Sequence, residues 1–375
     1  MKNVLVIPHV PTHKVKVREK EIARHLSRWH NCFYLSWTES YTYTLVSRIS
    51  VLLKDMLKRT KIKKEGKLKI VEFPTMHQPP GLANHFNRAQ LDRFCVKKNI
   101  DVVLSSSYFL FSVPEDKKYK YIYDFVDLPA KEFESKFGKF VYNHTQKEVK
   151  KADLVIACSK GLIDFIRTEY QRDAVWIPNG ADLEDFRKIQ KHQIDKIRQK
   201  YGLSQRFVIG CIGHFGPWMN LGFLIEGFKK LKKEMKDAAL FLVGPGKDVI
   251  YFRKKIKDPQ IIFTDSISPE DIYPYFAAMD VAVLPKEKSY QQDLAFHIKL
   301  IEYTAAKKTI VSANLKEVER LNFPNVIIVP NEVSRWIEAV KKARKMRWQE
   351  SWNHLVDSYD WSKICTKLSS LIEQL

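Results

Sequence analysis

The sequence has little of what marks a zinc protein, a disulfide-linked domain or a membrane-spanning chain. Its five cysteines are scattered among 375 residues without a C-x-x-C pair, so neither a zinc site nor a disulfide framework is predicted. An odd number of cysteines in a long chain fits a reducing cytoplasm. No apolar run approaches the roughly 20 residues of a membrane-spanning helix, and the N-terminal MKNVLVIPHVP is too short for a signal peptide. We therefore expect a cytoplasmic protein.

Acidic residues are also scarce relative to basic ones. Asp and Glu number 43 against 64 Lys and Arg, which gives a formal net charge of +21. This excess predicts attraction to an anionic partner, such as nucleic acid, an acidic membrane leaflet or a phosphorylated substrate. The alternative is a Lys-rich surface that only contacts solvent. The hydrophobic content of 45% is sufficient for a large core, and the length suits two domains.

Buried, Val- and Ile-rich segments alternate with helical patterns in two series. The first series of predicted strands is 3–7, 32–37, 68–74, 101–107, 120–127, 152–159 and 174–182, and the second is 206–214, 238–246, 261–267, 280–285, 308–313 and 325–330. Residues 18–29 predict an amphipathic helix with Ile22, Ala23, Leu26 and Trp29 on one stripe. Such alternation is typical of parallel sheets covered by helices on both faces. A charged helical connector, 183–205, separates the two series.

The order of motifs resembles that of GT-B glycosyltransferases, most closely the family 4, or group 1, enzymes. The resemblance rests on ADLVIACSKGLIDFI with WIPNGAD, VIGCIGHFGPWMNLGFLIEGFKKL, FLVGPG, SISPEDIYPYFAAMDVAVLP, HIKLIEYTAAKKTIV and the terminal YDWSKI. The segment YDFVDLP is also similar to polysaccharide and teichuronic-acid-type glycosyltransferases and glucuronosyltransferases. The resemblance implies two doubly wound Rossmann-like domains facing across a cleft. The two domains are an acceptor-binding domain (1–185) and a nucleotide-sugar-binding domain (186–355). A terminal helix (356–375) is expected to pack back on the first domain.

The resemblance places the donor, a UDP- or GDP-linked sugar and not a bound cofactor, on the second domain. Lys299 and Glu302 lie three apart on one predicted helix, where the lysine can neutralise a diphosphate and the glutamate can accept from ribose hydroxyls. The alternative is an intrahelical ion pair. The other expected donor-binding residues are Gly213, His214, Phe215, His297 and Ile298.

Two departures from the family pattern bear on the chemistry. His214 stands where the family usually has Arg, and no Lys follows before Lys229, which weakens the expected phosphate clamp. Position 294 is Leu where a glutamate often faces the donor sugar, with Asp293 beside it. Asp293 and Trp218 are candidate donor-sugar contacts, although Trp218 could equally be a core residue. Retention or inversion of the anomeric configuration stays open.

The acceptor side is predicted from YIYDFVDLP. A carboxylate at this strand end can deprotonate an acceptor hydroxyl, and we favour Asp127 over Asp124 as that catalytic base. Asp124 and His13 are candidate acceptor contacts. His13, His77, His85 and His144 show no ligand-pair spacing, so no bound metal is expected.

Residues 43–69 combine an apolar face with many basic residues. This pattern reads as a basic amphipathic helix for an anionic membrane surface, and hence as peripheral attachment to the inner face of the membrane. An ordinary helix with a solvated tail is the alternative. The acceptor is expected to be a glycan or a lipid-linked saccharide in cell-surface polysaccharide or glycolipid synthesis. A sugar-nucleotide epimerase, a non-catalytic GT-B subunit and, remotely, a nucleic-acid-binding protein are the competing functions. Nucleic acid is not an expected partner, because the aromatics do not cluster with Arg and Lys.

Overall fold

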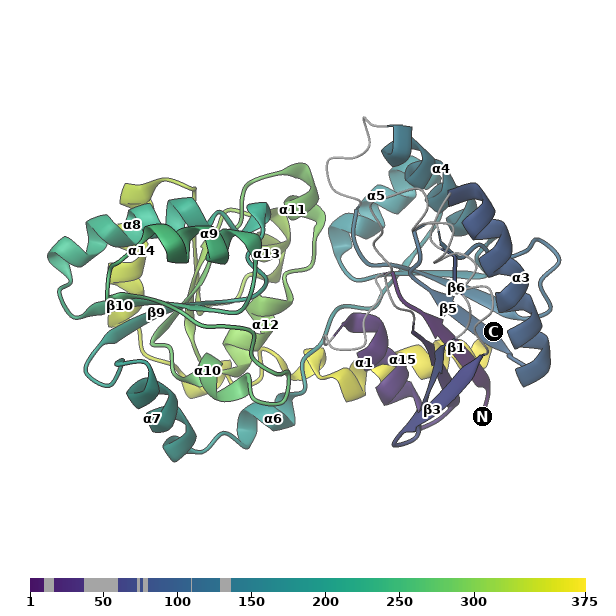
Figure 1. Ribbon diagram of the computed structural model, residues 1–375, viewed down its shortest axis with the longest axis horizontal. Helices are drawn as coiled ribbons and strands as arrows, with labels where there is room; N and C mark the ends of the chain where they lie inside the picture. The colour runs from purple at the N-terminus through teal and green to yellow at the C-terminus, as the bar shows by residue number, and fades with distance from the viewer. Residues whose placement is uncertain (10–16, 37–59, 73–74, 77–79, 109, 129–135) are drawn as a thin grey trace. The chain divides into compact units, whose positions relative to one another are not determined.

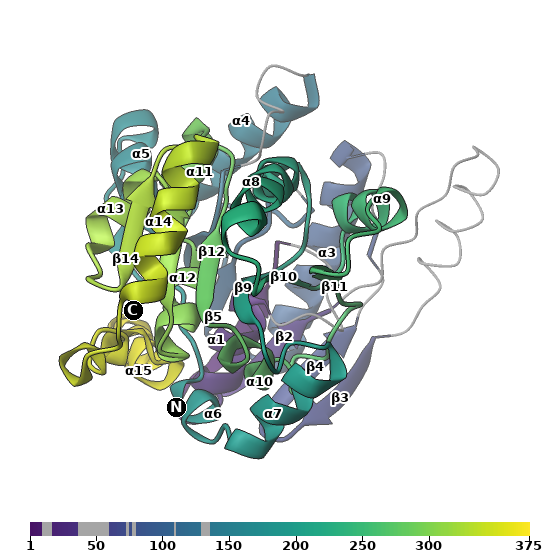
Figure 2. The same ribbon diagram turned by 90° about the vertical axis from the view of Figure 1, so that its left-hand side faces the viewer.

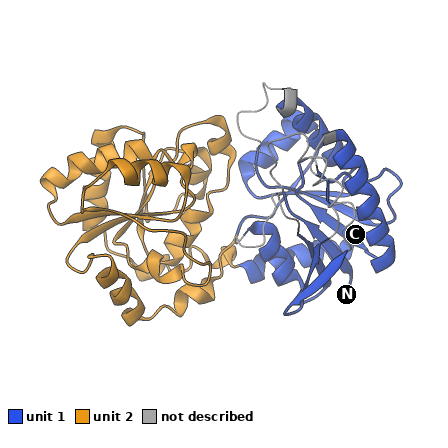
Figure 3. Cartoon of the chain, viewed as in Figure 1, with its two compact units in different colours: residues 1–179, 361–375 blue, residues 180–360 orange. Residues whose placement is uncertain are grey.

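The computed structural model describes residues 1–9, 17–36, 60–72, 75–76, 80–108, 110–128 and 136–375. These residues fold into two compact units, shown in Figures 1 and 3. Unit 1 contains residues 1–179 together with 361–375, and unit 2 contains residues 180–360. The chain therefore leaves unit 1 after Asn179 and returns to it at Trp361.

Unit 1 is built on a sheet whose described strands run in the order β3-β4-β2-β1-β5-β6-β7-β8. Their bounds are β1 (Asn3–Ile7), β2 (Asn31–Leu35), β3 (Lys61–Glu65), β4 (Leu68–Glu72), β5 (Val102–Ser105), β6 (Lys120–Phe125), β7 (Leu154–Ala157) and β8 (Val175–Trp176). All neighbouring pairs are parallel except the β3–β4 hairpin. The carboxyl ends of β1, β5 and β6 therefore meet at one edge of this sheet.

The C-terminal helix is part of unit 1. The described helices of this unit are α1 (Arg18–Leu26), α3 (Pro80–Lys98), α4 (Lys136–Lys151), α5 (Lys160–Tyr170) and α15 (Trp361–Gln374). α15 packs beside α1, and its Trp361, Ile364 and Leu368 join one apolar core with Val4 and Val6 of β1. Chain ends 370 residues apart are joined by a hydrogen bond of 2.8 Å from Lys2 Nζ to the Ile372 carbonyl.

Unit 2 has a fully parallel sheet in the order β11-β10-β9-β12-β13-β14. Its strands are β9 (Phe207–Ile212), β10 (Ala238–Val243), β11 (Ile261–Phe263), β12 (Val281–Leu284), β13 (Thr309–Ala313) and β14 (Val326–Val329). Its helices are α6 (Leu183–Arg187), α7 (Lys191–Lys200), α8 (Leu221–Glu234), α9 (Lys247–Lys255), α10 (Tyr273–Ala277), α11 (Tyr290–Leu294), α12 (Ile298–Ala305), α13 (Lys316–Leu321) and α14 (Val333–Lys345). α8 and α14 pack against each other and share one core with the sheet, as Figure 2 lets the reader follow.

The prediction of parallel sheets covered by helices is confirmed for both units. Apolar side chains fill β1, β9 and β10 because both faces of these strands are covered. The predicted helix over 18–29 is too long at its end: it stops at Leu26, and Trp29 is 37% exposed instead of buried. The chain must turn there, because Asn31 already donates a 2.9 Å hydrogen bond to the Lys2 carbonyl and begins β2.

The basic segment is also corrected where it is described. Residues 43–59, which hold the predicted apolar face, lie outside the described residues. Lys61, Lys63 and Lys64 lie on strand β3 and not on a helix, because the chain turns back at Gly66 and Lys67 into β4. Gly66 has a φ of +59°, which a two-residue hairpin turn requires and glycine adopts without strain. All residues from 60 to 67 are exposed.

Candidate functional site

At the carboxyl edge of the unit 2 sheet, glycines allow two strand-end loops to approach closely. Gly213 follows β9, and Gly244 and Gly246 follow β10. A Cβ atom on Gly244 would lie 2.2 Å from the Gly213 carbonyl oxygen, and one on Gly246 would lie 2.1 Å from that of Phe215. Their φ angles of +122° and +153° also favour glycine. The loops therefore present backbone rather than side chains at this edge.

Lys299 and Glu302 lie one turn apart on α12, close to its N-terminus. Lys299 Nζ is 2.6 Å from Glu302 Oε2, and the two side chains are 27% and 17% exposed. The lysine also lies over the Phe276 ring, 5.3 Å from its centre. The intrahelical ion pair, our alternative reading, is therefore present. A ligand that uses both residues must replace part of this pair.

Tyr303 ties α12 to the glycine loop. Its buried hydroxyl accepts a hydrogen bond of 2.8 Å from the N–H of Ile212, the residue before Gly213. Burial raises the pKa of Tyr303, so the phenol stays neutral and keeps this contact. The sequence analysis missed Tyr303, although a tyrosine on the apolar face of a helix usually needs a partner for its hydroxyl.

A second lysine, also missed, lies at the same edge of the sheet. Burial raises the pKa of the Cys211 thiol in β9, and the charges of Lys286 and Lys299 oppose this shift. Lys286 follows β12, the parallel neighbour of β9, so it lies at the same edge of the sheet as the carboxyl end of β9. Lys286 follows β12 in the run LPKEK, where a lysine just beyond a buried strand was the available signal. The edge thus offers two cations where the sequence analysis found one.

An exposed aromatic pair completes this edge. Trp218 is 43% exposed, which excludes the core alternative for this residue. Its ring stacks on His214 with centres 6.2 Å apart and an interplanar angle of 23°. Gly216 makes room for it, because a Cβ there would lie 2.6 Å from the Trp218 ring. The pair offers a flat surface for a ring-shaped group.

The other predicted donor contacts are buried or half-buried, and the side chains of two of them have hydrogen-bond partners within the protein. The Phe215 side chain is completely buried in the core of unit 2, so the predicted donor contact of this residue would have to use its backbone. His297 donates from Nε2 to the Gln292 carbonyl at 2.9 Å, and burial with the charge of Lys286 lowers its pKa to about 4. Asp293 is 8% exposed and accepts from Lys288 Nζ at 2.8 Å. Ile298 is the first residue of α12 and is half-buried.

The carboxyl edge of the unit 1 sheet holds a hydrogen-bonded group that the sequence analysis missed. His9 follows β1, Glu19 is on α1, and Ser106 follows β5. Glu19 Oε1 accepts from His9 Nδ1, from the His9 N–H at 3.2 Å and from Ser106 Oγ at 2.8 Å. Ser106 is placed there by its own N–H, which donates to the Ile7 carbonyl at 2.9 Å.

Asp127 lies at the same edge, after β6. Its side chain is exposed, and Oδ1 accepts the N–H of Leu128 at 2.9 Å. The Tyr108 hydroxyl donates to the Asp127 carbonyl at 3.3 Å, and the Tyr108 ring lies edge-on to His9 with centres 5.5 Å apart. Tyr108 therefore connects the segment after β6 to His9. Of the two candidate acceptor contacts, His13 lies outside the described residues.

The other, Asp124, serves a structural role. It is 1% exposed and pairs through both oxygens with Arg18, at 2.9 and 3.0 Å. Arg18 also donates to the carbonyls of Ile177 and Pro178 at 2.7 and 2.9 Å and to Asn179 Oδ1 at 3.0 Å. The expected acceptor contact of Asp124 is therefore corrected, because this pair anchors the last residues of unit 1 before the chain leaves it.

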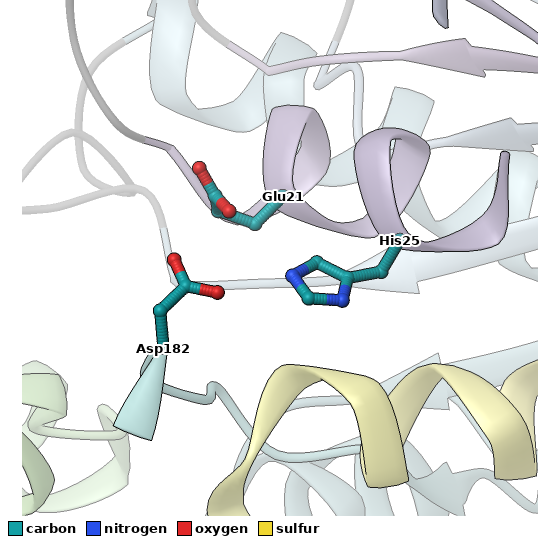
Figure 4. Close-up of side chains that lie close together, drawn as sticks. All are labelled: Glu21, His25 and Asp182. Carbon is teal, nitrogen blue, oxygen red and sulfur yellow. The ribbon is translucent and has the colours of Figure 1, made fainter. Parts of the chain in front are cut away.

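The polar residues of α1 face different surroundings. Glu21 and His25 lie one turn apart on the same side of the helix (Figure 4), and Glu21 pairs with Arg24. Glu19, two residues before Glu21, cannot share that side, because positions two apart on a helix do not face each other. Glu19 alone of these two carboxylates reaches the group at the end of β1.

Residues 206–345, most of unit 2, match the family described as glycosyl transferases group 1. An uncharacterized glycosyltransferase of Methanocaldococcus jannaschii is 22% identical, over 76% of this chain and 70% of its own length. A putative teichuronic acid biosynthesis glycosyltransferase of Bacillus subtilis, TuaH, is 24% identical over 55% of this chain and 53% of its own. The aligned region thus spans about half of the second relative.

Solved structures match over the whole chain. Sucrose-phosphate synthase from Thermosynechococcus elongatus superposes with a TM-score of 0.76 at 12% identity, covering 100% of this chain and 99% of that one. HepE of Anabaena in complex with UDP-glucose gives 0.72 at 16% identity, covering 100% of both chains. Identities this low show the fold alone, which is the predicted GT-B fold.

Proposed function

We propose that this GT-B protein, whose residues 206–345 belong to the glycosyl transferases group 1 family, moves a sugar from a nucleotide-sugar donor to a hydroxyl group. The acceptor in this proposal is a glycan or a lipid-linked saccharide of cell-surface polysaccharide or glycolipid synthesis. The family match on unit 2 supports the reaction. The name of the teichuronic acid relative supports the class of acceptor.

The observation that carries the proposal is the arrangement of the unit 2 sheet edge. Ligands of parallel α/β sheets bind at the carboxyl ends of the strands. There the chain places glycine loops, the ammonium groups of Lys286 and Lys299, and the carboxylate of Glu302. A diphosphate would lie against the cations, and a ribose would offer two hydroxyls to Glu302. We propose a UDP- or GDP-linked sugar, since the HepE complex holds UDP-glucose.

The acceptor is assigned to unit 1. Its sheet edge carries His9, Glu19 and Ser106 together with the exposed carboxylate of Asp127. These groups can accept a proton from a hydroxyl that attacks the anomeric carbon. The prediction that Asp127 itself is the base stays a prediction.

Among the competing functions, the absence of the usual Arg and Lys after Gly213 leaves a non-catalytic subunit as an alternative. Lys286 supplies a second positive charge at the same edge of the sheet from another strand. The relatives named above are glycosyltransferases, which favours transfer over epimerisation. Transfer therefore remains the function that the site supports best.

A screen of UDP-, GDP- and ADP-sugars by thermal unfolding tests the proposal. A ligand that binds only the folded state raises the melting temperature by mass action. At a concentration 100 times its Kd, it increases the free energy of unfolding by about 2.7 kcal/mol. We expect one nucleotide class to stabilise the protein and then to support transfer to a saccharide acceptor. Binding without any transfer or hydrolysis would favour the non-catalytic subunit.

Replacing Glu302 by Ala should weaken donor binding by about 2–4 kcal/mol, through loss of two hydrogen bonds to a charged acceptor. The melting temperature of the ligand-free protein should change little, because a partly exposed ion pair contributes about 1 kcal/mol or less. Titration calorimetry and thermal unfolding measure the two quantities. A large stability loss with unaltered donor affinity would assign Glu302 to the ion pair alone.

A membrane surface is a second proposed partner. No helix among the described residues is long and apolar enough to span a bilayer. The β3–β4 hairpin exposes Lys61, Lys64 and Lys67, so anionic headgroups have direct access to it. We infer peripheral attachment through residues 43–69, of which only this hairpin is described.

Reversing Lys61, Lys64 and Lys67 to Glu should lower binding to phosphatidylserine vesicles at least about tenfold, since each lysine near such a surface contributes about 1 kcal/mol. Wild-type binding should also weaken as salt rises. The matched control reverses Lys229, Lys230 and Lys233 on α8, which changes the net charge equally. Equal losses in both variants would show an effect of net charge and not of the hairpin.

A further inference from the structure

We propose that His297 accepts a hydrogen bond from a hydroxyl group of the donor sugar, through the lone pair on its ring nitrogen Nδ1. This inference rests on the proposed function and names the residue that recognises the sugar part of the donor. The segment from the end of β12 to the start of α12 lies at the carboxyl edge of the unit 2 sheet, because α12 leads back to β13, which is parallel to β12. His297 is the last residue of this segment, two residues before Lys299.

The orientation and the protonation state of the His297 ring are defined by its surroundings. Nε2 lies 2.9 Å from the carbonyl oxygen of Gln292. A carbonyl oxygen only accepts hydrogen bonds, so Nε2 carries the proton. Burial, together with the charge of Lys286, lowers the pKa of His297 to about 4, so the ring is neutral near neutral pH. Nδ1 therefore has no proton and can only accept a hydrogen bond.

The lone pair on Nδ1 is not used within the described part of the protein. His297 is the N-cap residue of α12, where a side chain often accepts an N–H of the first turn, but it makes no such hydrogen bond. Among the described residues, the side-chain atoms that are both shut off from solvent and unpartnered do not include Nδ1. Nδ1 is therefore open to solvent, although the residue as a whole is only 7% exposed. A ligand that brings a hydrogen-bond donor can reach it.

The side chains just before His297 do not provide an equivalent acceptor. Asp293 accepts from Lys288 Nζ at 2.8 Å and from the N–H of Lys316 at 3.2 Å, so its carboxylate links α11 to the start of α13. The side-chain oxygen of Gln292 has no donor, but it is closed to solvent. Leu294, which stands where the family often has a glutamate, is buried and apolar. We therefore assign recognition of the sugar in this segment to His297 and not to Asp293.

The chemistry of Nδ1 selects a hydroxyl group. Ionised phosphate and carboxylate oxygens only accept hydrogen bonds, so they cannot pair with this lone pair, whereas a hydroxyl donates to it. The donor carries hydroxyls on its ribose and on its sugar, and the ribose is assigned to Glu302. The sugar is bonded to the diphosphate, which is assigned to Lys299, and His297 lies two residues from that lysine. A sugar hydroxyl is therefore the partner that fits Nδ1.

Two substitutions in the full chain separate the roles of the two ring nitrogens. The probes are UDP-glucose with UDP, GDP-mannose with GDP or ADP-glucose with ADP, according to the class selected by the thermal screen. In His297→Gln the amide nitrogen can still donate to the Gln292 carbonyl, but no acceptor stands at the position of Nδ1. We expect the affinity for the nucleotide sugar to fall about tenfold, through loss of one hydrogen bond, and the affinity for the free nucleoside diphosphate to stay unchanged. Titration calorimetry measures both affinities.

His297→Asn is the complementary variant. Its Oδ1 stands near the position of Nδ1 and can accept the hydroxyl, while the hydrogen bond to the Gln292 carbonyl is lost. We expect its affinity for the nucleotide sugar to stay within about threefold of the wild type, and its melting temperature to fall. The matched control is His192→Gln on α7, an exposed histidine of the same unit, which should change neither quantity. If His297→Asn does not fold, His297→Gln with its two probes still decides.

Donor analogues with fluorine in place of each sugar hydroxyl identify the partner of Nδ1. Fluorine does not donate a hydrogen bond, so the analogue that lacks the contacted hydroxyl should bind the wild type about tenfold more weakly than the unmodified donor. In His297→Gln the same two molecules should bind equally, because the variant has already lost the acceptor.

Three results would overturn the assignment. An equal loss for the nucleotide sugar and the nucleoside diphosphate in His297→Gln would show that His297 supports the nucleotide site and not the sugar. Unchanged affinity for the nucleotide sugar in that variant would show that Nδ1 does not contact it. Fluorine analogues that lose as much affinity in His297→Gln as in the wild type would place the hydroxyl on another residue. Failure of the wild type to bind any of the probes would instead contradict the proposed function.

Discussion

Truncating Lys299 to Ala should lower kcat by about 10²–10³-fold, the range seen when one group that stabilises developing charge is removed. Its ammonium lies at the start of α12, and Lys286 lies at the same edge of the sheet as the carboxyl end of β9. The charge of a departing diphosphate is greatest in the transition state, so turnover should suffer more than donor affinity. Steady-state kinetics and donor titration measure both effects.

Two further variants sharpen this test. Lys299→Arg keeps the charge and should recover part of the activity. Lys229→Ala is the control: it removes an exposed lysine about two turns after the start of α8 and should leave kcat unchanged. A rise in KM with unaltered kcat in Lys299→Ala would show that the lysine binds ground state and transition state equally.

Replacing Arg18 by Met should destabilise unit 1 by about 3–5 kcal/mol, the usual loss when one partner of a buried ion pair is removed. Asp124 would remain buried without its cation, and the carbonyls of Ile177 and Pro178 would lose a donor. When the unfolding of unit 1 is followed in a urea titration, the urea concentration at its midpoint should be lower than in the wild type. Donor binding, which belongs to unit 2, should persist.

The control and a second variant separate the causes. Arg24→Met removes a half-exposed arginine from the same helix and should have an effect of about 1 kcal/mol or less. The double variant Arg18→Met with Asp124→Leu should recover much of the loss, because no buried charge is left unpaired. An Arg18→Met protein as stable as the wild type would contradict the anchoring role.

Both sheets could be predicted because parallel strands that are covered by helices on both faces have short, mostly apolar sequences. Strand β1 has the predicted bounds. Ends of elements were less predictable, since they depend on tertiary contacts. The helix over 18–29 ends early because β2 must begin at Asn31 beside β1.

The sites show the limit of local patterns more clearly. Phe215 follows Gly213 in sequence, but the pattern does not tell which side of the loop meets the core. Asp124 and Asp127 lie three residues apart, and only the position of Arg18, 106 residues away from Asp124, decides which is buried. These assignments depend on contacts between distant residues.

The histidine and glutamate of unit 1 were missed for the same reason, although one signal was present. Glu19 lies on the helix stripe of Ile22, Ala23 and Leu26, where a carboxylate would be buried. A charged residue on a buried stripe requires a partner. The sequence does not say which one, because Ser106 is 87 residues away.

The central claim is that unit 2 binds the nucleotide of the donor at its glycine loops and α12. Hydrogen–deuterium exchange, measured by mass spectrometry with and without the nucleotide sugar from the thermal screen, tests it most directly. The account predicts that protection on binding is greatest in peptides covering 213–219, 244–247 and 286–303. Protection confined to peptides of unit 1, with none in these three segments, would contradict it.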